Sequence, residues 1–204
     1  MSKRKVPEVN AGSMADIAFL LLIFFLVTTT IEKDEGIIRY LPLEITEKPL
    51  PIKERNALII NINEVGEFFV NEKVTPIKEI SQIATDFIDN GGAKSDNPTL
   101  YCAYCKGKRN PKSSDNPQKA VIAISAHRKS AYKNYIALQN ELTRAYNQLR
   151  NRESQRLFKY DYTTIKKEIA EGRFKGNIEK TKEELKQIRD LFPLLITDAE
   201  AKKE

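Results

Sequence analysis

The chain has 204 residues, of which 41% are hydrophobic and 30% are charged, and its formal net charge is +6. These values suit one membrane span together with one soluble domain of modest size. Its one local basic cluster consists of Lys106, Lys108, Arg109 and Lys112. This cluster lacks interleaved aromatic residues beyond Tyr101 and Tyr104, which argues against a protein that binds nucleic acid.

Asp16 lies in a segment where a carboxylate is costly. Residues 11–31 contain this single ionisable group, and residues 17–31 contain none. A carboxylate at the centre of a membrane-spanning helix costs about 2.5 to 3.5 kcal/mol on insertion scales, so it usually faces a protein interior or a water path. We therefore predict a transmembrane helix over residues 11–31, with Asp16 as a candidate functional residue. The alternative is that Asp16 begins the helix at the level of the lipid headgroups, where its cost is small.

The residues on either side of this segment bear on whether it is retained. Lys3, Arg4 and Lys5 predict a cytoplasmic tail over residues 1–10 and a chain that is otherwise outside the cytoplasm. The same charges and a fifteen-residue apolar run are also compatible with a secretory signal peptide. However, no small-x-small cleavage site follows the run, and an acidic residue directly before it is unusual in a signal peptide. A retained anchor is therefore favoured.

A linker and then a folded domain are predicted after the span. Residues 32–56 carry Pro42, Pro49 and Pro51, which forbid a helix and favour an extended linker, with a short strand over residues 37–43. The folded domain is predicted over residues 57–152.

The elements of this domain follow from hydrophobic periodicity. Alternation predicts a strand over residues 57–63, with Leu58, Ile60 and Ile62 on one face, and a hairpin partner over residues 67–71. Thr75 is predicted to cap a helix that has Pro76 at its first position and that ends at Gly91 and Gly92. An apolar run predicts a central strand over residues 120–126. A helix over residues 132–152 has one apolar stripe, formed by Tyr135, Leu138, Leu142, Ala145 and Leu149.

Residues 91–117 form a polar insertion that contains both cysteines of the chain, Cys102 and Cys105. A lone CxxC motif supplies two of the four ligands of a structural zinc site, and Lys106 follows where c-type haem attachment requires His. A redox enzyme would need the motif after a strand, at a helix N-terminus. A disulfide within the loop is the leading expectation for an extracytoplasmic domain, and a zinc ion shared across a dimer is the alternative.

Helical spacing recurs in residues 153–204, which are predicted to form a helical extension. The repeating positions are Ile165 and Ile169, and then Ile178, Leu185, Ile188 and Phe192. Together these elements predict an α+β fold, in which one N-terminal transmembrane helix precedes a mixed sheet packed by two helices.

This combination resembles the ExbD/TolR family of bacterial biopolymer transport proteins. The resemblance rests on Asp16 with the aliphatic run that follows it to Phe25, on Leu41-Pro42 after the span, and on the closing strand and helix over residues 120–146. It covers roughly residues 8 to 150. Three features depart from the family: the insertion, the residues beyond about 152, and His127, which stands where the family usually has Asp. A lone His after a strand is most often structural, so His127 is assigned no role.

The resemblance implies a mechanism. Family members form a dimer of helices inside a pentameric ring of a polytopic partner that resembles ExbB or TolQ. Proton flow through this complex drives movement that is passed to a TonB- or TolA-like protein. It implies a bacterial inner-membrane location with a periplasmic domain, a proton gradient as the energy source and no bound cofactor. Asp16 would accept the proton, since desolvation favours the neutral form of a carboxyl group.

The helical period places further residues on the Asp16 face. Gly12 and Ser13 lie one turn before Asp16, and Leu20 and Ile23 lie one and two turns after it. The small residues permit close approach of another helix. This part of the face is the predicted proton path, and it continues into predicted packing at Val27 and Thr30.

Two other functions compete with a motor subunit. A membrane-anchored scaffold that grips peptidoglycan or envelope proteins would tolerate Asp16→Asn, because binding needs no proton site. A secreted enzyme is disfavoured, because the domain has one His, no Ser/His/Asp grouping and no glycine-rich phosphate loop.

Overall fold

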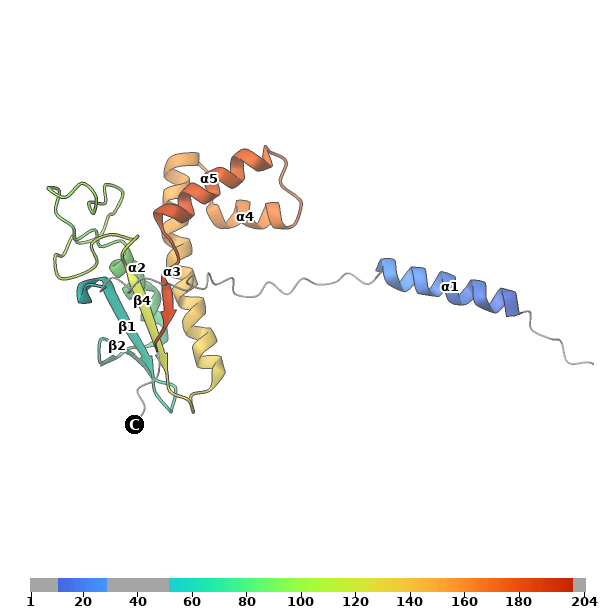
Figure 1. Cartoon of the computed structure of the whole chain (residues 1–204), viewed down its shortest axis with the longest axis horizontal. Coiled ribbons are helices and arrows are strands. Elements are labelled where there is room, and N and C mark those ends of the chain that lie inside the picture. The colour runs from blue at the N-terminus through green and yellow to red at the C-terminus, as the bar shows by residue number, and fades with distance from the viewer. Residues whose placement is uncertain (1–10, 29–51, 200–204) are drawn as a thin grey trace, which may run out of the picture. The chain divides into compact units, whose positions relative to one another are not determined.

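The computed structural model describes residues 11–28 and 52–199 (Figure 1). The chain divides into two units, residues 1–49 and 50–204, and each unit is described by itself. The predicted cytoplasmic tail, the last three residues of the predicted span, the predicted linker as far as residue 51 with its predicted short strand, and residues 200–204 lie outside the described residues.

The second unit is built on a five-stranded mixed sheet of order β3-β2-β1-β4-β5. Its strands are β1 (Ala57–Ile62), β2 (Phe68–Val70), β3 (Lys73–Val74), β4 (Val121–Ala126) and β5 (Ile196–Asp198). The first three are antiparallel neighbours, whereas β1, β4 and β5 run parallel. The predicted α+β class with a mixed sheet is confirmed. The tight turn between β1 and β2 requires Gly66, whose φ of 89° is strained for other residues.

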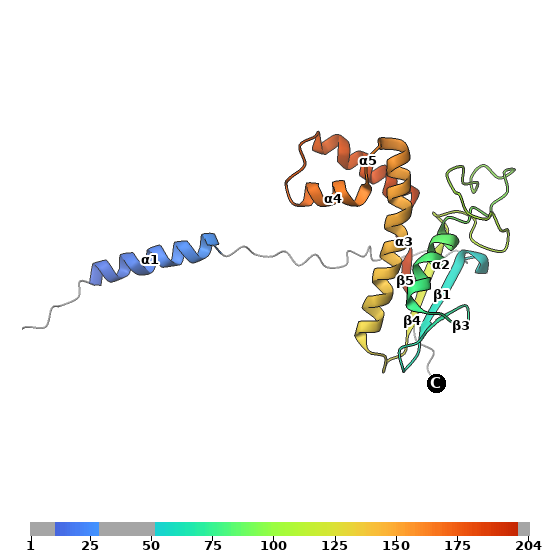
Figure 2. The ribbon, with the colours of Figure 1, turned by 180° about the vertical axis from the view of Figure 1, so that it is seen from behind.

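Two helices, α2 (Ile77–Ile88) and α3 (Tyr132–Phe158), cover one face of the sheet (Figure 2). Leu58, Ile60 and Ile62 of β1 are 3%, 0% and 2% exposed, as their alternation predicts. They pack against α2 and against Leu138, Leu142, Ala145 and Leu149 of α3, the predicted stripe. The hydrophobic core therefore lies between the sheet and these two helices.

The predicted cap of α2 is wrong. Pro76 occupies the N-cap position and the helix begins at Ile77. The hydroxyl of Thr75 instead donates a hydrogen bond to the carbonyl of Lys73, at 3.1 Å. This geometry keeps Thr75 in the turn after β3, so its side chain cannot reach the free amide groups of the helix.

The C-terminal extension contains two helices and also a strand. The helix α3 continues past residue 152 to Phe158, and α4 (Tyr162–Ala170) and α5 (Ile178–Leu191) pack on its C-terminal part around Tyr162, Leu185 and Ile188. The chain then returns to the sheet as β5, which was not predicted. Phe192, which directly precedes this return, is 0% exposed and packs in the main hydrophobic core.

Buried polar contacts hold the insertion 91–117 at its base. Asn56 and Asp115 exchange two hydrogen bonds, and Arg55 forms a salt bridge with the same carboxylate, at 2.5 Å. The side-chain amide of Asn90 donates to the carbonyls of Asn110 and Ser114. These contacts hold the insertion to the body of the domain, because Asn90, Asn110, Ser114 and Asp115 satisfy one another or Asn56 and Arg55 in buried hydrogen bonds and a salt bridge.

Tyr146 of α3 makes the stability of the fold sensitive to alkaline pH. Its side chain is fully buried, and burial raises its pKa from 10 to about 12, while its hydroxyl accepts a hydrogen bond from the backbone amide of Leu195. The unfolded state therefore loses this proton at a lower pH than the folded state does. The stabilisation is complete below pH 10 and is lost as the pH rises towards 12.

We expect the free energy of unfolding to fall by up to about 3 kcal/mol through this residue between pH 10 and 12, at about 1.4 kcal/mol per pKa unit. Urea denaturation at a series of pH values measures this slope. A Tyr146→Phe variant should show a shallower slope. An identical slope in both proteins would contradict the assignment.

Candidate functional site

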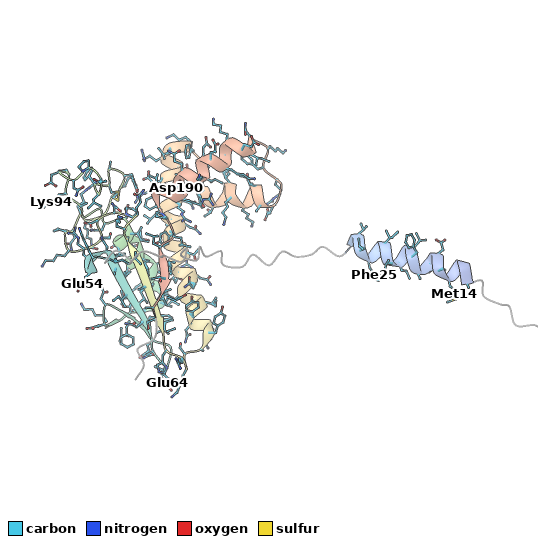
Figure 3. All side chains as sticks on the ribbon, in the orientation of Figure 1. Met14, Phe25, Glu54, Glu64, Lys94 and Asp190 are labelled. Atoms are coloured by element: carbon cyan, nitrogen blue, oxygen red, sulfur yellow. A yellow bond between two sulfur atoms is a disulfide. The ribbon has the colours of Figure 1, made fainter. Side chains whose placement is uncertain are left out.

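The helix α1 (Ala11–Thr28) is apolar on all sides and carries one ionisable residue, Asp16. Every side chain that is described in α1 is exposed, including Leu20 at 59% and Phe24 at 59%. Figure 3 shows these side chains projecting around the helix, with Met14 and Phe25 labelled. A helix that is apolar all round requires apolar surroundings on every side rather than on one face.

Asp16 is the sixth residue of α1 and lies outside its first turn. At a rise of about 1.5 Å per residue, its backbone is roughly 7.5 Å along the axis from Ala11. Because three to four residues separate it from the free amide groups of the first turn, it does not serve as the N-terminal cap of the described helix. The structure therefore places its carboxylate within the helical segment.

The predicted path residues fall on the helical face of Asp16. Gly12 and Ser13 precede it, and Leu20 and Ile23 follow it within the same helix. Leu20 is 59% exposed and Ile23 is 43% exposed, so neither is covered by other residues of α1. The face thus consists of one carboxylate flanked by small residues on one side and by aliphatic residues on the other.

Thr28, the last residue of α1, forms its side-chain hydrogen bond within the helix. The hydroxyl of Thr28 donates a hydrogen bond to the carbonyl of Phe24, four residues earlier, at 2.7 Å. Such back-bonding hides a hydroxyl within an apolar helix. Thr30, which is predicted to continue the packing part of this face, lies outside the described residues.

Within residues 11–28 and 52–199, no helix meets both the length and the hydropathy that crossing a membrane requires.

The two cysteines form a disulfide in the insertion. Cys102 and Cys105 are 1% and 5% exposed, and the guanidinium group of Arg109 donates hydrogen bonds to both of their carbonyls. Both sulfur atoms are thereby withdrawn from metal coordination. In the described part of the chain, no cluster of three or more His, Cys, Asp or Glu side chains is placed to hold a metal ion.

His127 lies directly after β4, at the mouth of a hollow of about 520 Å³. Its Nδ1 accepts a hydrogen bond from the backbone amide of Lys129, at 3.3 Å, and its own amide donates to the carbonyl of Ile62. The hydrogen bond from Lys129 places the imidazole against the turn between β4 and α3, and the backbone bond to Ile62 continues the pairing of β4 with β1.

Sequence reasoning missed the acidic residue that reaches the same hollow. Asp198 of β5 lines it together with His127 and accepts a hydrogen bond from the hydroxyl of Tyr135, at 3.0 Å. Asp198 is 63 residues from Tyr135 in sequence. Only the return of the extension to the sheet brings the two together, and the short segment that forms β5 gives no clear strand signal.

Comparison with known families identifies the first three quarters of the chain. A family model described as Biopolymer transport protein ExbD/TolR matches residues 2–152. The match includes α1 with Asp16, the whole sheet except β5, and α3 as far as Arg152. A search of curated proteins found no match.

Proposed function

The chain belongs to the ExbD/TolR family of biopolymer transport proteins, and on this basis we propose that it is the proton-coupled subunit of an inner-membrane motor that powers transport across the outer membrane. The family supports an energy-transducing role in biopolymer transport. The observation that carries the finer proposal is Asp16, a carboxylate in a helix that is otherwise apolar on all sides.

Residues 11–31 are proposed to anchor the chain in the bacterial inner membrane, with the N-terminus cytoplasmic and the domain periplasmic. The eighteen residues of α1 extend over roughly 27 Å, compared with about 30 Å of hydrocarbon in a typical bilayer. The sequence continues without charge to Ile31, beyond the described helix. The disulfide supports a periplasmic domain, because such bonds persist in oxidising compartments.

One helix cannot enclose a proton path, so the motor requires other subunits. The apolar surface of α1 on every side supports contacts with several surrounding helices rather than with one. We assign these contacts to a second copy of α1 and to a pentameric ring of an ExbB- or TolQ-like protein. Movement would then pass to a TonB- or TolA-like protein. The proton gradient takes the place of a cofactor, and no enzymatic activity is proposed.

In this proposal Asp16 takes up a proton from one side of the membrane and releases it to the other. The charged form is costly in apolar surroundings, whereas the neutral form is not. Uptake of a proton therefore changes which neighbouring groups the helix prefers to contact. Gly12 and Ser13 allow a neighbouring helix to come close to the carboxylate, and Leu20 and Ile23 close the path above it.

The location can be tested with a full-length chain that carries a C-terminal tag. We expect the protein to stay in the membrane fraction after alkaline carbonate extraction, and we expect protease added to spheroplasts to digest the tagged domain. A matched double variant, Leu21→Arg with Phe24→Arg, adds about 2.5 to 3.5 kcal/mol for each charge at the helix centre and should be lost from the membrane. Release of the unmodified protein by carbonate, or protection of its domain, would contradict the anchor.

A further inference from the structure

The polar insertion is fixed to the end of the sheet at which β1 begins. Its residue Asp115, 1% exposed, bonds to Arg55 and Asn56, which directly precede β1. The insertion also contacts the end of α2, because the backbone amide of Gly107 donates to the carbonyl of Asp89 at 3.0 Å. Figure 1 shows the loops of the insertion beyond the start of β1. The insertion therefore presents a held surface at one end of the second unit.

The exposed charge at this end is mainly positive. We call the surface formed by its five exposed lysines the basic end. These lysines are Lys53, Lys94, Lys106, Lys108 and Lys112. The exposed acidic residues of the insertion and of the five residues before β1 are Asp96 and Glu54. Within the described residues, Lys108 is the one lysine of the five that has a salt-bridge partner, Asp86 at 4.0 Å. The basic end therefore carries positive charge that the domain itself does not neutralise.

The arginines at this end are used inside the domain. Arg55 is bound to the buried carboxylate of Asp115. Arg109 donates hydrogen bonds to the carbonyls of both cysteines, and its guanidinium group lies 5.0 Å from the centre of the Tyr101 ring. An arginine side chain offers a rigid fork that matches one carboxylate or phosphate, whereas a lysine is a mobile, hydrated point charge. A surface whose available charges are all lysines suits an extended anionic surface better than one particular acidic side chain.

A hollow of about 480 Å³ lies beside these lysines. Lys53, Arg55 and Lys94 line it, and so does Asp96. Sites for small molecules have volumes of about 300 to 1,000 Å³, so a phospholipid headgroup fits this space. The cations suit its phosphate, and the carboxylate of Asp96 can accept a hydrogen bond from a hydroxyl or amine group of the same headgroup.

The basic end is also the place at which the chain enters the domain. Residues 32–51 separate the predicted span from Ile52, the first described residue of the second unit. Fully extended, twenty residues reach roughly 70 Å, so the basic end of an anchored chain stays within that distance of the bilayer. Tyr101, 40% exposed, adds an aromatic ring of the kind that is enriched at the level of lipid headgroups.

We propose that the basic end docks onto the anionic phospholipid headgroups of the bilayer that anchors the chain. This inference rests on the proposed function for the anchor, which keeps the headgroups at high local concentration. Clusters of lysine and arginine next to a membrane span are attracted to anionic lipid, and the attraction falls off within a Debye length, about 8 Å at physiological salt. Docking should therefore require anionic lipid and should be reversed by salt.

Fluorescence quenching tests the proposal in the full chain. The two native cysteines are bonded to each other, so one introduced cysteine can be labelled with a fluorophore. Thr99→Cys places the label on the insertion. Val65→Cys, at a position that is 78% exposed in the turn after β1, is the matched control at the opposite end of that strand. Figure 3 labels Lys94 and Glu64, which mark these two ends. The chain is reconstituted into phosphatidylcholine vesicles, with and without anionic phosphatidylglycerol, that contain a lipid with a quencher on its headgroup.

We expect quenching at position 99 to be at least fivefold stronger with phosphatidylglycerol than without it, and to return to the lower value at high salt. Quenching at position 65 should change less than twofold. Equal quenching with and without the anionic lipid, or equal quenching at the two positions, would overturn the proposal. So would its loss in millimolar inorganic phosphate, which would indicate a site for a small anion instead of a membrane surface.

Charge removal gives a second measurement. The test variant combines Lys94→Gln, Lys106→Gln and Lys112→Gln. The matched control combines Lys133→Gln, Lys166→Gln and Lys182→Gln, which are exposed lysines outside the insertion and change the net charge equally. We expect the test variant to lower quenching at position 99 at least fivefold and the control to leave it within twofold. Thermal unfolding shows that each variant is folded. An equal effect of the two variants would mean that net charge, rather than the basic end, is responsible, and would overturn the proposal.

The outcome is separable from that of the proposed function. Asp16→Asn should leave the quenching unchanged, because Asp16 belongs to the first unit of the chain and the basic end to the second. Loss of lipid-dependent quenching in a chain that remains in the vesicles would overturn the docking alone. A chain that does not remain in the vesicles would overturn the anchor. Its flotation with preformed phosphatidylglycerol vesicles then tests the basic end, and failure to float would overturn the docking as well.

Discussion

Asp16→Asn is expected to reduce energy-dependent transport at least tenfold while the amount of protein in the membrane stays normal. Asparagine has nearly the same size and retains hydrogen bonding, but it cannot take up and release a proton. It also costs less than a carboxylate in apolar surroundings, so insertion of the helix should not suffer. The expected defect is therefore confined to the coupling of proton transfer to transport.

The measurement is energy-dependent uptake in cells that carry the variant as their single copy, with membrane abundance and co-purification of the ring-forming partner checked in parallel. Asp16→Glu retains the proton site and should retain part of the activity. Thr28→Ala removes another polar group of the same helix, one that bonds to its own backbone, and should be close to neutral. Full activity of Asp16→Asn would remove the motor mechanism and favour the anchored scaffold.

The sequence predicts most of the sheet and its two helices, because their signals are local. The alternation in β1 identifies its buried face, and the stripe from Leu138 to Leu149 identifies the buried side of α3. Each of these elements buries one face over most of its length, so the period of the hydrophobic residues is sufficient.

The features that the sequence does not predict depend on residues that are far apart. Asn56 and Asp115, which hold the insertion, are 59 residues apart, and β5 joins the sheet through a parallel pairing with β4. No local pattern specifies such a partner. The prediction that Thr75 caps α2 was wrong for a related reason. A threonine that caps a helix and a threonine that bonds within a turn have the same local sequence pattern, and only the path of the chain distinguishes them.

For the candidate site, the sequence predicts the carboxylate but not its surroundings. An isolated charge in an apolar run is conspicuous, whereas the groups that would contact it in the proposed motor belong to other chains. The structure adds that residues 11–28 form one continuous helix with Asp16 inside it.

Phe192→Ala is expected to lower the free energy of unfolding by about 3 to 5 kcal/mol, the range for deleting a buried phenyl ring. Phe192 is fully buried, and its ring lies 5.4 Å from that of Tyr104, in an edge-to-face arrangement. Its carbonyl accepts two hydrogen bonds from the guanidinium group of Arg150. Phe192 therefore contacts both the insertion and α3, just before the chain enters β5.

Because Phe192 lies between α5 and β5, its loss should also loosen the return of the chain to the sheet. Hydrogen exchange should then show lower protection of the Ile122 amide, which bonds to the carbonyl of Leu195. Urea denaturation of the full chain in detergent measures the global effect. Phe174→Ala, in the loop before α5, removes a ring that is only partly buried and should cost about 1 kcal/mol. Equal costs at the two positions would mean that the extension is not anchored through Phe192, and β5 would then have to be held by its ladder with β4 alone.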